Sequence, residues 1–119
     1  MLEVLLVDDS MFMRKMLRAS LPKENFIVTG EASCGLEAIE LCKSHKYDVI
    51  FLDITMPDMN GVETLKEIKK IDEDANVIMC SAMGQEFFIK ESIIAGAKDF
   101  IVKPFNAERI RVSLNKLFS

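Results

Sequence analysis

Short apolar runs alternate with helix-like periodicity five times along the chain, and this alternation restricts the possible folds more than any other feature. Each run is followed by a segment with apolar residues three and four positions apart. Five strand–helix units predict an α/β fold, in which helices cover both faces of a five-stranded parallel sheet. The predicted strands are residues 3–7, 26–31, 48–53, 76–81 and 98–102, and the predicted helices begin near Ser10, Gly35, Gly61, Gln85 and Asn106.

Composition excludes several classes of protein. The 119 residues suit one domain, and an apolar fraction of 50% allows a well-filled core. A net charge of −4 argues against nucleic acid as a partner. The chain shows neither a leader pattern nor an apolar stretch of the ~20 residues that a membrane span needs, so we expect a cytoplasmic protein. The cysteines are odd in number and lack metal-ligand spacing, so we expect reduced thiols at Cys34, Cys42 and Cys80.

Two of the predicted strands run directly into carboxylates. Asp8 and Asp9 follow the first strand, and Asp53 ends the third. Ligands of open parallel sheets bind outside the carboxyl ends of the strands, so these aspartates should share one crevice. Ionised carboxylates a few Å apart repel one another, and a fold does not need such a cluster. The sequence therefore predicts a site for a divalent cation with oxygen ligands.

The other strand ends add groups that suit phosphoryl transfer. The backbone carbonyl of Thr55 can turn back towards the acids as a neutral ligand, and Ser81 brings a hydroxyl to the same crevice. Lys103 ends the fifth strand as a counter-charge, and its bond to Pro104 is of the kind that can be cis. An acidic nucleophile, a Mg²⁺ site, a lysine and a hydroxyl donor are the parts for transferring a phosphoryl group to a carboxylate.

Taken together, these segments resemble the receiver domain of two-component response regulators over the whole chain. The matching segments are Val7–Ser10, Asp53–Pro57 with Gly61, Ser81–Ala82, Ala95–Ala97 and Phe100–Phe105. Within that family, Met79–Gln85 and Ala97–Ile101 look most like stand-alone chemotaxis regulators of the CheY type. The resemblance implies a doubly wound, flavodoxin-like sheet of order 2-1-3-4-5 with five helices. It also implies a single receiver domain over residues 1–119 with no output domain.

The resemblance also implies a role for each site residue. Asp53 would accept the phosphoryl group, while Ser81 and Lys103 would bind it. Phe100 would be the aromatic switch that swings inward when the Ser81 hydroxyl moves towards the phosphate. The residues expected to hold Mg²⁺ are Asp8, through water, and Asp9, Asp53 and the Thr55 carbonyl, directly.

The implied function is a signalling switch rather than an enzyme in the ordinary sense. The chain would take a phosphoryl group from a histidine kinase of the chemotaxis type and catalyse its own dephosphorylation. Its fourth helix, fifth strand and fifth helix would then bind a target such as the flagellar motor switch protein. A phosphatase is a further expected partner, nucleic acid and membrane are not, and we expect a monomer.

Three alternatives compete with this interpretation. A phosphorelay intermediate would pass the phosphoryl group on to a histidine phosphotransfer domain. A Mg²⁺-dependent phosphohydrolase resembling the haloacid-dehalogenase type needs a second aspartate two residues after the nucleophile, where this chain has Thr55. A flavodoxin-like cofactor carrier needs a phosphate-binding loop after the first strand, where Asp8 and Asp9 would repel phosphate.

Four further residues carry smaller predictions. Met11 and Phe12 lie off the apolar face of the first helix and beside the acid pair, so we predict that this helix docks the kinase. Met83 and Thr55 should flank the path of the hydrolytic water. Because a thioether orients water poorly, we predict that loss of phosphate is not especially fast. His45 is predicted to lie at a helix edge.

Overall fold

The computed structural model describes residues 1–118, which form five strands and five helices in strict alternation. The strands are β1 (Leu2–Val7), β2 (Phe26–Ala32), β3 (Val49–Asp53), β4 (Val77–Ser81) and β5 (Asp99–Val102). The helices are α1 (Met11–Ser20), α2 (Gly35–Ser44), α3 (Gly61–Ile71), α4 (Glu86–Ile94) and α5 (Ala107–Phe118). Every strand ends and every helix begins within about one residue of its predicted position.

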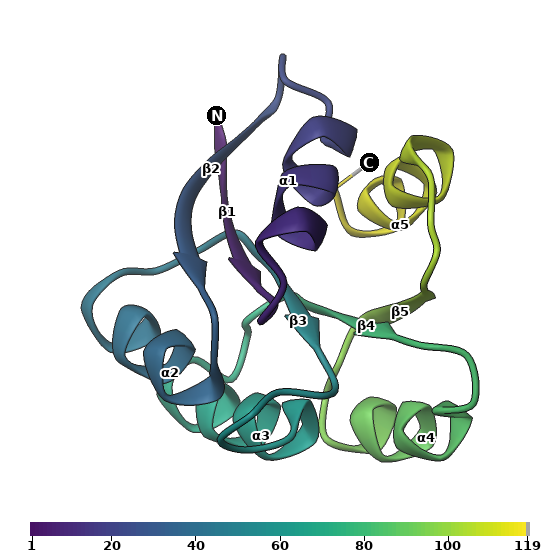
Figure 1. The fold of residues 1–119 in the computed structure, drawn as a ribbon. Helices are drawn as coiled ribbons and strands as arrows, with labels where there is room; N and C mark the ends of the chain where they lie inside the picture. The colour runs from purple at the N-terminus through teal and green to yellow at the C-terminus, as the bar shows by residue number, and fades with distance from the viewer. Residues whose placement is uncertain (119) are drawn as a thin grey trace.

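The strands form one parallel sheet in the order β2-β1-β3-β4-β5. Both the α/β class and the predicted order 2-1-3-4-5 are thereby confirmed. Helices α1 and α5 cover one face of the sheet, and α2, α3 and α4 cover the other (Figure 1). From β1 the chain first adds β2 on one side and then β3 on the other side, so the winding of the sheet reverses at β1. The carboxyl ends of β1 and β3 therefore lie side by side at this topological switch point, where such sheets bind ligands.

The core divides into two layers because successive strand residues point to opposite faces. One layer joins α1 and α5 to residues of the central strands that include Val4, Leu6, Val49 and Phe51. The other joins α2 and α3 to the alternate positions, which include Leu5, Val7, Ile50 and Leu52. Central strands are buried on both faces along most of their length and are therefore almost entirely apolar, which is why the sequence signal for β1, β3 and β4 is so clear.

Several local features match the sequence predictions. Ser10 caps α1 by accepting a hydrogen bond from the backbone N–H of Met13 at 3.2 Å. The peptide bond between Lys103 and Pro104 is cis. In the described part of the chain all the cysteines are free, with Cys80 buried. No helix among residues 1–118 is long and apolar enough to cross a membrane.

Candidate functional site

Three carboxylates meet at the carboxyl end of the sheet. One oxygen from each of Asp8, Asp9 and Asp53 lies within 4.8 Å of the others. Asp8 and Asp53 are 1% and 5% exposed, whereas Asp9 is open to solvent. The cluster that the strand ends predicted is therefore present, with two buried acids at its base and one at its mouth.

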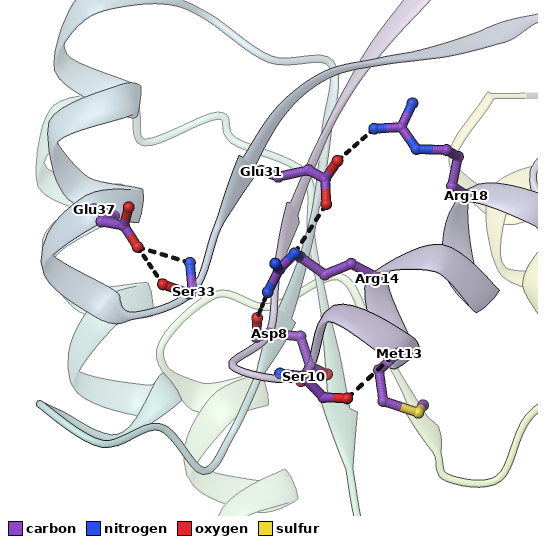
Figure 2. A network of polar contacts seen from close by, with 8 residues as sticks. All are labelled: Asp8, Ser10, Met13, Arg14, Arg18, Glu31, Ser33 and Glu37. Atoms are coloured by element: carbon purple, nitrogen blue, oxygen red, sulfur yellow. Dashed lines mark hydrogen bonds and ion pairs between the residues drawn. The ribbon is translucent and has the colours of Figure 1, made fainter.

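The β1–α1 loop holds Asp8 firmly. Asp8 Oδ1 accepts the N–H of Ser10 at 2.9 Å, and the backbone N–H of Asp8 donates to Ala32 on β2. Arg14 of α1 donates to the carbonyl of Asp8 and pairs with Glu31 at 2.9 Å (Figure 2). The first turn of α1 is thus tied to both β1 and β2, which fixes the direction of the Asp8 side chain.

Asp53 is positioned by a close approach of the backbone. Gly61, the first residue of α3, packs directly on the carbonyl of Asp53, where an added Cβ would lie 2.3 Å from that oxygen. The N–H of Gly61 donates to the carbonyl of Ile54. Only glycine allows α3 to begin this near to the end of β3. Its place in the sequence is thereby explained by the packing of the site.

Lys103 brings the only ammonium group that pairs with these acids in residues 1–118. Its Nζ lies 2.8 Å from Asp8 Oδ2 and 3.2 Å from Asp53 Oδ1. Its backbone N–H donates to the carbonyl of Ser81 at 2.7 Å, which joins the ends of β4 and β5. Burial alone would lower the pKa of Lys103, but the contacts with Asp8 and Asp53 outweigh it and the pKa is raised. The lysine is therefore held as a cation.

One lysine does not balance three acids. Burial is the main cause that raises the pKa of Asp53 to about 6; the charges of Asp8 and Asp9 act in the same direction, and Lys103 opposes them. The site therefore holds excess negative charge in a partly desolvated place. Hard oxygen donors at this spacing fit a divalent cation such as Mg²⁺. The Thr55 carbonyl, in the exposed loop after β3, stays a predicted ligand.

Ser81 carries an unpaired hydroxyl. It is the last residue of β4, is fully buried, and its Oγ has no hydrogen-bond partner among residues 1–118. Leaving a buried hydroxyl unpaired costs roughly 1–3 kcal/mol. Because β4 lies between β3 and β5, this hydroxyl belongs to the same sheet edge as Asp53 and Lys103 and is available to donate to an incoming anionic oxygen.

Phe100 lies in the middle of β5 and is half-buried against the α2/α3 layer of the core. Its backbone is held at both ends. Its N–H donates to Asp99 Oδ1 at 2.8 Å, and its carbonyl accepts from Arg109 Nη2 at 2.7 Å. The aromatic ring is thus carried by a fixed segment of backbone.

Two features of the structure escaped the sequence interpretation. Asp99 is buried within β5 and accepts the hydroxyl of Ser113 at 2.7 Å, with Arg109 and Lys116 at 3.6 and 3.7 Å. A usable signal existed, because these partners lie about one helical turn apart on α5. The other feature is Gln85, whose carboxamide links two loops at the site. Its position at the start of a helix gave no sign of that role.

The residues with smaller predictions lie at the surface. Phe12, Met11 and Met83 are 68%, 61% and 79% exposed, so all three are open to solvent. His45 is the C-cap residue that directly follows α2, pairs with Glu3 at 2.8 Å, and lies outside the acid cluster, which agrees with the predicted helix-edge position.

Comparison with known proteins agrees with this geometry. The sequence model of the response regulator receiver domain matches residues 4–115. The chain is 54% identical over 114 residues to the chemotaxis protein CheY of Thermotoga maritima, covering 96% of this chain and 95% of the relative. It is 52% identical over 113 residues to CheY of Bacillus subtilis, covering 95% and 94%. Among solved structures, a chain of the CheX–CheY–BeF3–Mg²⁺ complex from Borrelia burgdorferi superposes with a TM-score of 0.92 at 40% identity, covering 99% of this chain and 90% of that one.

Proposed function

The chain belongs to the receiver-domain family of response regulators and is of the CheY type, and from this membership we propose that it is a phosphorylation-activated switch in chemotaxis signalling. The observation that carries the proposal is the position of Asp53. Its buried carboxylate lies within reach of two other acids and the Lys103 ammonium, and the neighbouring strand β4 ends in the unpaired Ser81 hydroxyl.

The reaction begins at a carboxylate oxygen of Asp53. This oxygen attacks the phosphorus of a kinase phosphohistidine, and the bond from phosphorus to the imidazole nitrogen breaks. The electron pair of that bond stays with the imidazole, and an aspartyl phosphate remains on Asp53. The pKa of Asp53 is raised chiefly because burial leaves its ionised carboxylate poorly solvated. A positively charged group bound beside that carboxylate is therefore favoured.

The residues proposed to hold Mg²⁺ are Asp9, Asp53 and the Thr55 carbonyl, with Asp8 acting through water. When bound, the ion supplies positive charge for the transferring phosphoryl oxygens and orients the group for in-line attack. Lys103 adds a fixed ammonium, held by Asp8. The Ser81 hydroxyl completes the set by donating to a phosphoryl oxygen.

Movement of Ser81 towards the phosphoryl group opens space at the end of β4. We propose that the Phe100 ring fills this space, which changes the surface formed by α4, β5 and α5. Exposed apolar residues on α4, Phe87 at 74% and Ile94 at 77%, suit a protein target on that surface. The flagellar motor switch protein is the target we propose.

Kinase docking is assigned to α1, where Phe12 lies exposed close to the acid cluster. Loss of the phosphoryl group is catalysed by the same site. Because Met83 offers neither an amide nor a carboxylate to orient water, this loss is not especially fast for the class. A partner of the CheX kind, as in the Borrelia complex, would then accelerate it. A monomer in the cytoplasm completes the proposal.

Beryllofluoride, which mimics the phosphoryl group, tests the output. Addition of beryllofluoride and Mg²⁺ should shift the NMR resonances of α4, β5 and α5, and should increase affinity for a motor switch protein. Shifts confined to the acid cluster, with no gain in target affinity, would contradict the switch. Efficient transfer of the phosphoryl group to a histidine phosphotransfer domain would favour the relay alternative instead.

A further inference from the structure

A single carboxamide connects two loops at the edge of the site. Gln85 Oε1 accepts the backbone N–H of Ala82 at 2.7 Å, and Gln85 Nε2 donates to Thr55 Oγ1 at 2.5 Å. Ala82 directly follows β4, and Thr55 lies two residues beyond Asp53. The Gln85 side chain therefore ties the β4–α4 loop to the β3–α3 loop.

Gln85 is the N-cap residue of α4, yet within residues 1–118 its side chain caps no N–H of the helix. An N-cap side chain normally accepts from the first turn. Here it turns back to close the segment 82–85, which the backbone N–H of Gln85 also closes through the carbonyl of Ala82 at 3.2 Å. Gly84, at φ +90°, allows that turn. The start of α4 is thus held to the site rather than to its own helix.

The N–H that Gln85 occupies faces the β3 side of the site. The Ser81 carbonyl faces β5, where it accepts from Lys103. The N–H of Ala82 belongs to the same planar trans peptide unit, so it points the opposite way, towards the end of β3. The carbonyl of Cys80 also faces β3, where it accepts from Ile54. A phosphoryl group on Asp53 would therefore bring anionic oxygens to the side that the Ala82 N–H faces.

We propose that the Gln85 side chain is a latch that holds the β4–α4 loop in its unphosphorylated position and is displaced when a phosphoryl group on Asp53 takes the N–H of Ala82. This inference deepens the proposed function and rests on it. A backbone N–H binds an anionic oxygen more strongly than a neutral amide oxygen, so the exchange is favourable. Because Gln85 directly precedes α4, its release frees that end of the helix. The latch thus links Asp53 to α4 by a route separate from Ser81 and Phe100.

A contact made only in the unphosphorylated state must oppose phosphoryl binding. Removing the latch should therefore increase affinity for a phosphoryl mimic. The bond from the Ala82 N–H to Gln85, a single neutral hydrogen bond of modest net strength, corresponds to a change in affinity of about three- to tenfold.

The test compares Gln85→Met with wild type in two NMR measurements. Methionine keeps the length of the side chain but removes both polar atoms. In the free protein, the Ala82 amide should exchange with solvent about tenfold faster in the variant, since it loses its acceptor. With Mg²⁺ saturating, the dissociation constant for beryllofluoride should fall about three- to tenfold. Glu86→Met is the matched control at the same helix end. Within residues 1–118 the Glu86 side chain accepts a hydrogen bond only from the N–H of Gly84, at 3.4 Å, so both values should stay within about twofold of wild type.

The outcomes separate the latch from the proposed function. Beryllofluoride binding that is unchanged or weaker in Gln85→Met, while wild type binds, overturns the latch and leaves the function standing. An equal gain in beryllofluoride affinity for Glu86→Met also overturns the latch, because fraying at the start of α4 would then explain the gain. No binding by wild type overturns both. If Gln85→Met does not fold, Thr55→Val removes the acceptor at the other end of the latch and should tighten binding in the same direction.

Discussion

Lys103 Nζ lies 2.8 Å from Asp8 Oδ2, although the two residues are 95 positions apart in the chain. The contact joins the end of β5 to the end of β1 across the top of the sheet. Asp8 is 1% exposed, so its charge depends on this partner more than a surface acid would. The same ammonium lies 3.2 Å from Asp53. One lysine therefore holds the acid cluster together.

Removing that lysine should destabilise the protein. Lys103→Met leaves two buried carboxylates without a cation, and we expect a loss of about 2–4 kcal/mol in the free energy of unfolding at pH 7 without metal. Urea denaturation measures it. Lys98→Met, at an exposed lysine just before β5, should change stability by less than about 0.5 kcal/mol. Equal effects from the two substitutions would show that the Lys103 contacts contribute little.

Asp53→Asn should have the opposite effect in metal-free protein. The folded pKa of Asp53 is about 6, above its unfolded value of 3.8, so the folded state disfavours the ionised form. Stability from this group is greatest below pH 3.8 and is lost as pH rises through 6. At pH 7.5 the substitution should therefore stabilise by about 2–3 kcal/mol.

Urea denaturation from pH 5 to pH 7.5 with a chelator present gives the comparison. Asp74→Asn, at an exposed acid, is the matched control and should leave the pH profile unchanged. Added Mg²⁺ should stabilise wild type more than Asp53→Asn. A variant less stable than wild type at pH 7.5 would contradict the assigned charge balance.

The buried Asp99 should stabilise the β5–α5 unit. Burial alone would raise its pKa, but the Ser113 hydroxyl, the Phe100 N–H, Arg109 and Lys116 outweigh burial, and the pKa is lowered. For a lowered pKa, the stabilisation is present above the unfolded value and is lost as pH falls through the folded one. Asp99→Asn should therefore cost about 1–3 kcal/mol at pH 7 and less at pH 3.

Chemical denaturation at those two pH values measures the difference. Glu108→Gln is a suitable control, since Glu108 is an exposed acid that pairs with Arg111 on the surface of α5. It should change stability by less than about 0.5 kcal/mol. If Asp99→Asn behaves like Glu108→Gln, the hydrogen bond to Ser113 is not a stabilising element.

Phe12→Glu should separate kinase docking from the chemistry. The ring is 68% exposed on α1, so the substitution should not unfold the protein, but it places a charge where we propose that the kinase binds. Transfer from the phosphorylated kinase should slow about tenfold or more, as expected when an interface anchor is lost. Phosphorylation by acetyl phosphate should keep its rate.

Leu36→Glu provides the comparison for that assay. Leu36 is 61% exposed on α2, and so is a similar apolar residue on another helix. It should leave both rates unchanged. Equal slowing with kinase and acetyl phosphate in Phe12→Glu would place the defect in the site rather than in docking.

The fold was predictable because buried parallel strands are apolar throughout and end in turn residues. For that reason β1, β3 and β4 were placed within one residue. The cluster of Asp8, Asp53 and Lys103 was predictable on similar grounds, since parallel strands bring their carboxyl ends to one edge. The link from Gln85 to Thr55 was not, because it depends on the path of two loops that no periodic pattern describes. The Asp99–Ser113 contact was predictable only in part. Its one signal in the sequence is that the partners of Asp99 lie about one helical turn apart on α5.

Intact-protein mass spectrometry after incubation with acetyl phosphate tests the central claim most directly. The samples are wild type and Asp53→Asn, each with Mg²⁺ and with a chelator. We predict one added phosphoryl group on wild type, present only with Mg²⁺ and absent from Asp53→Asn. No adduct on wild type, under conditions that label a control receiver, would contradict the account, as would an adduct that persists in Asp53→Asn.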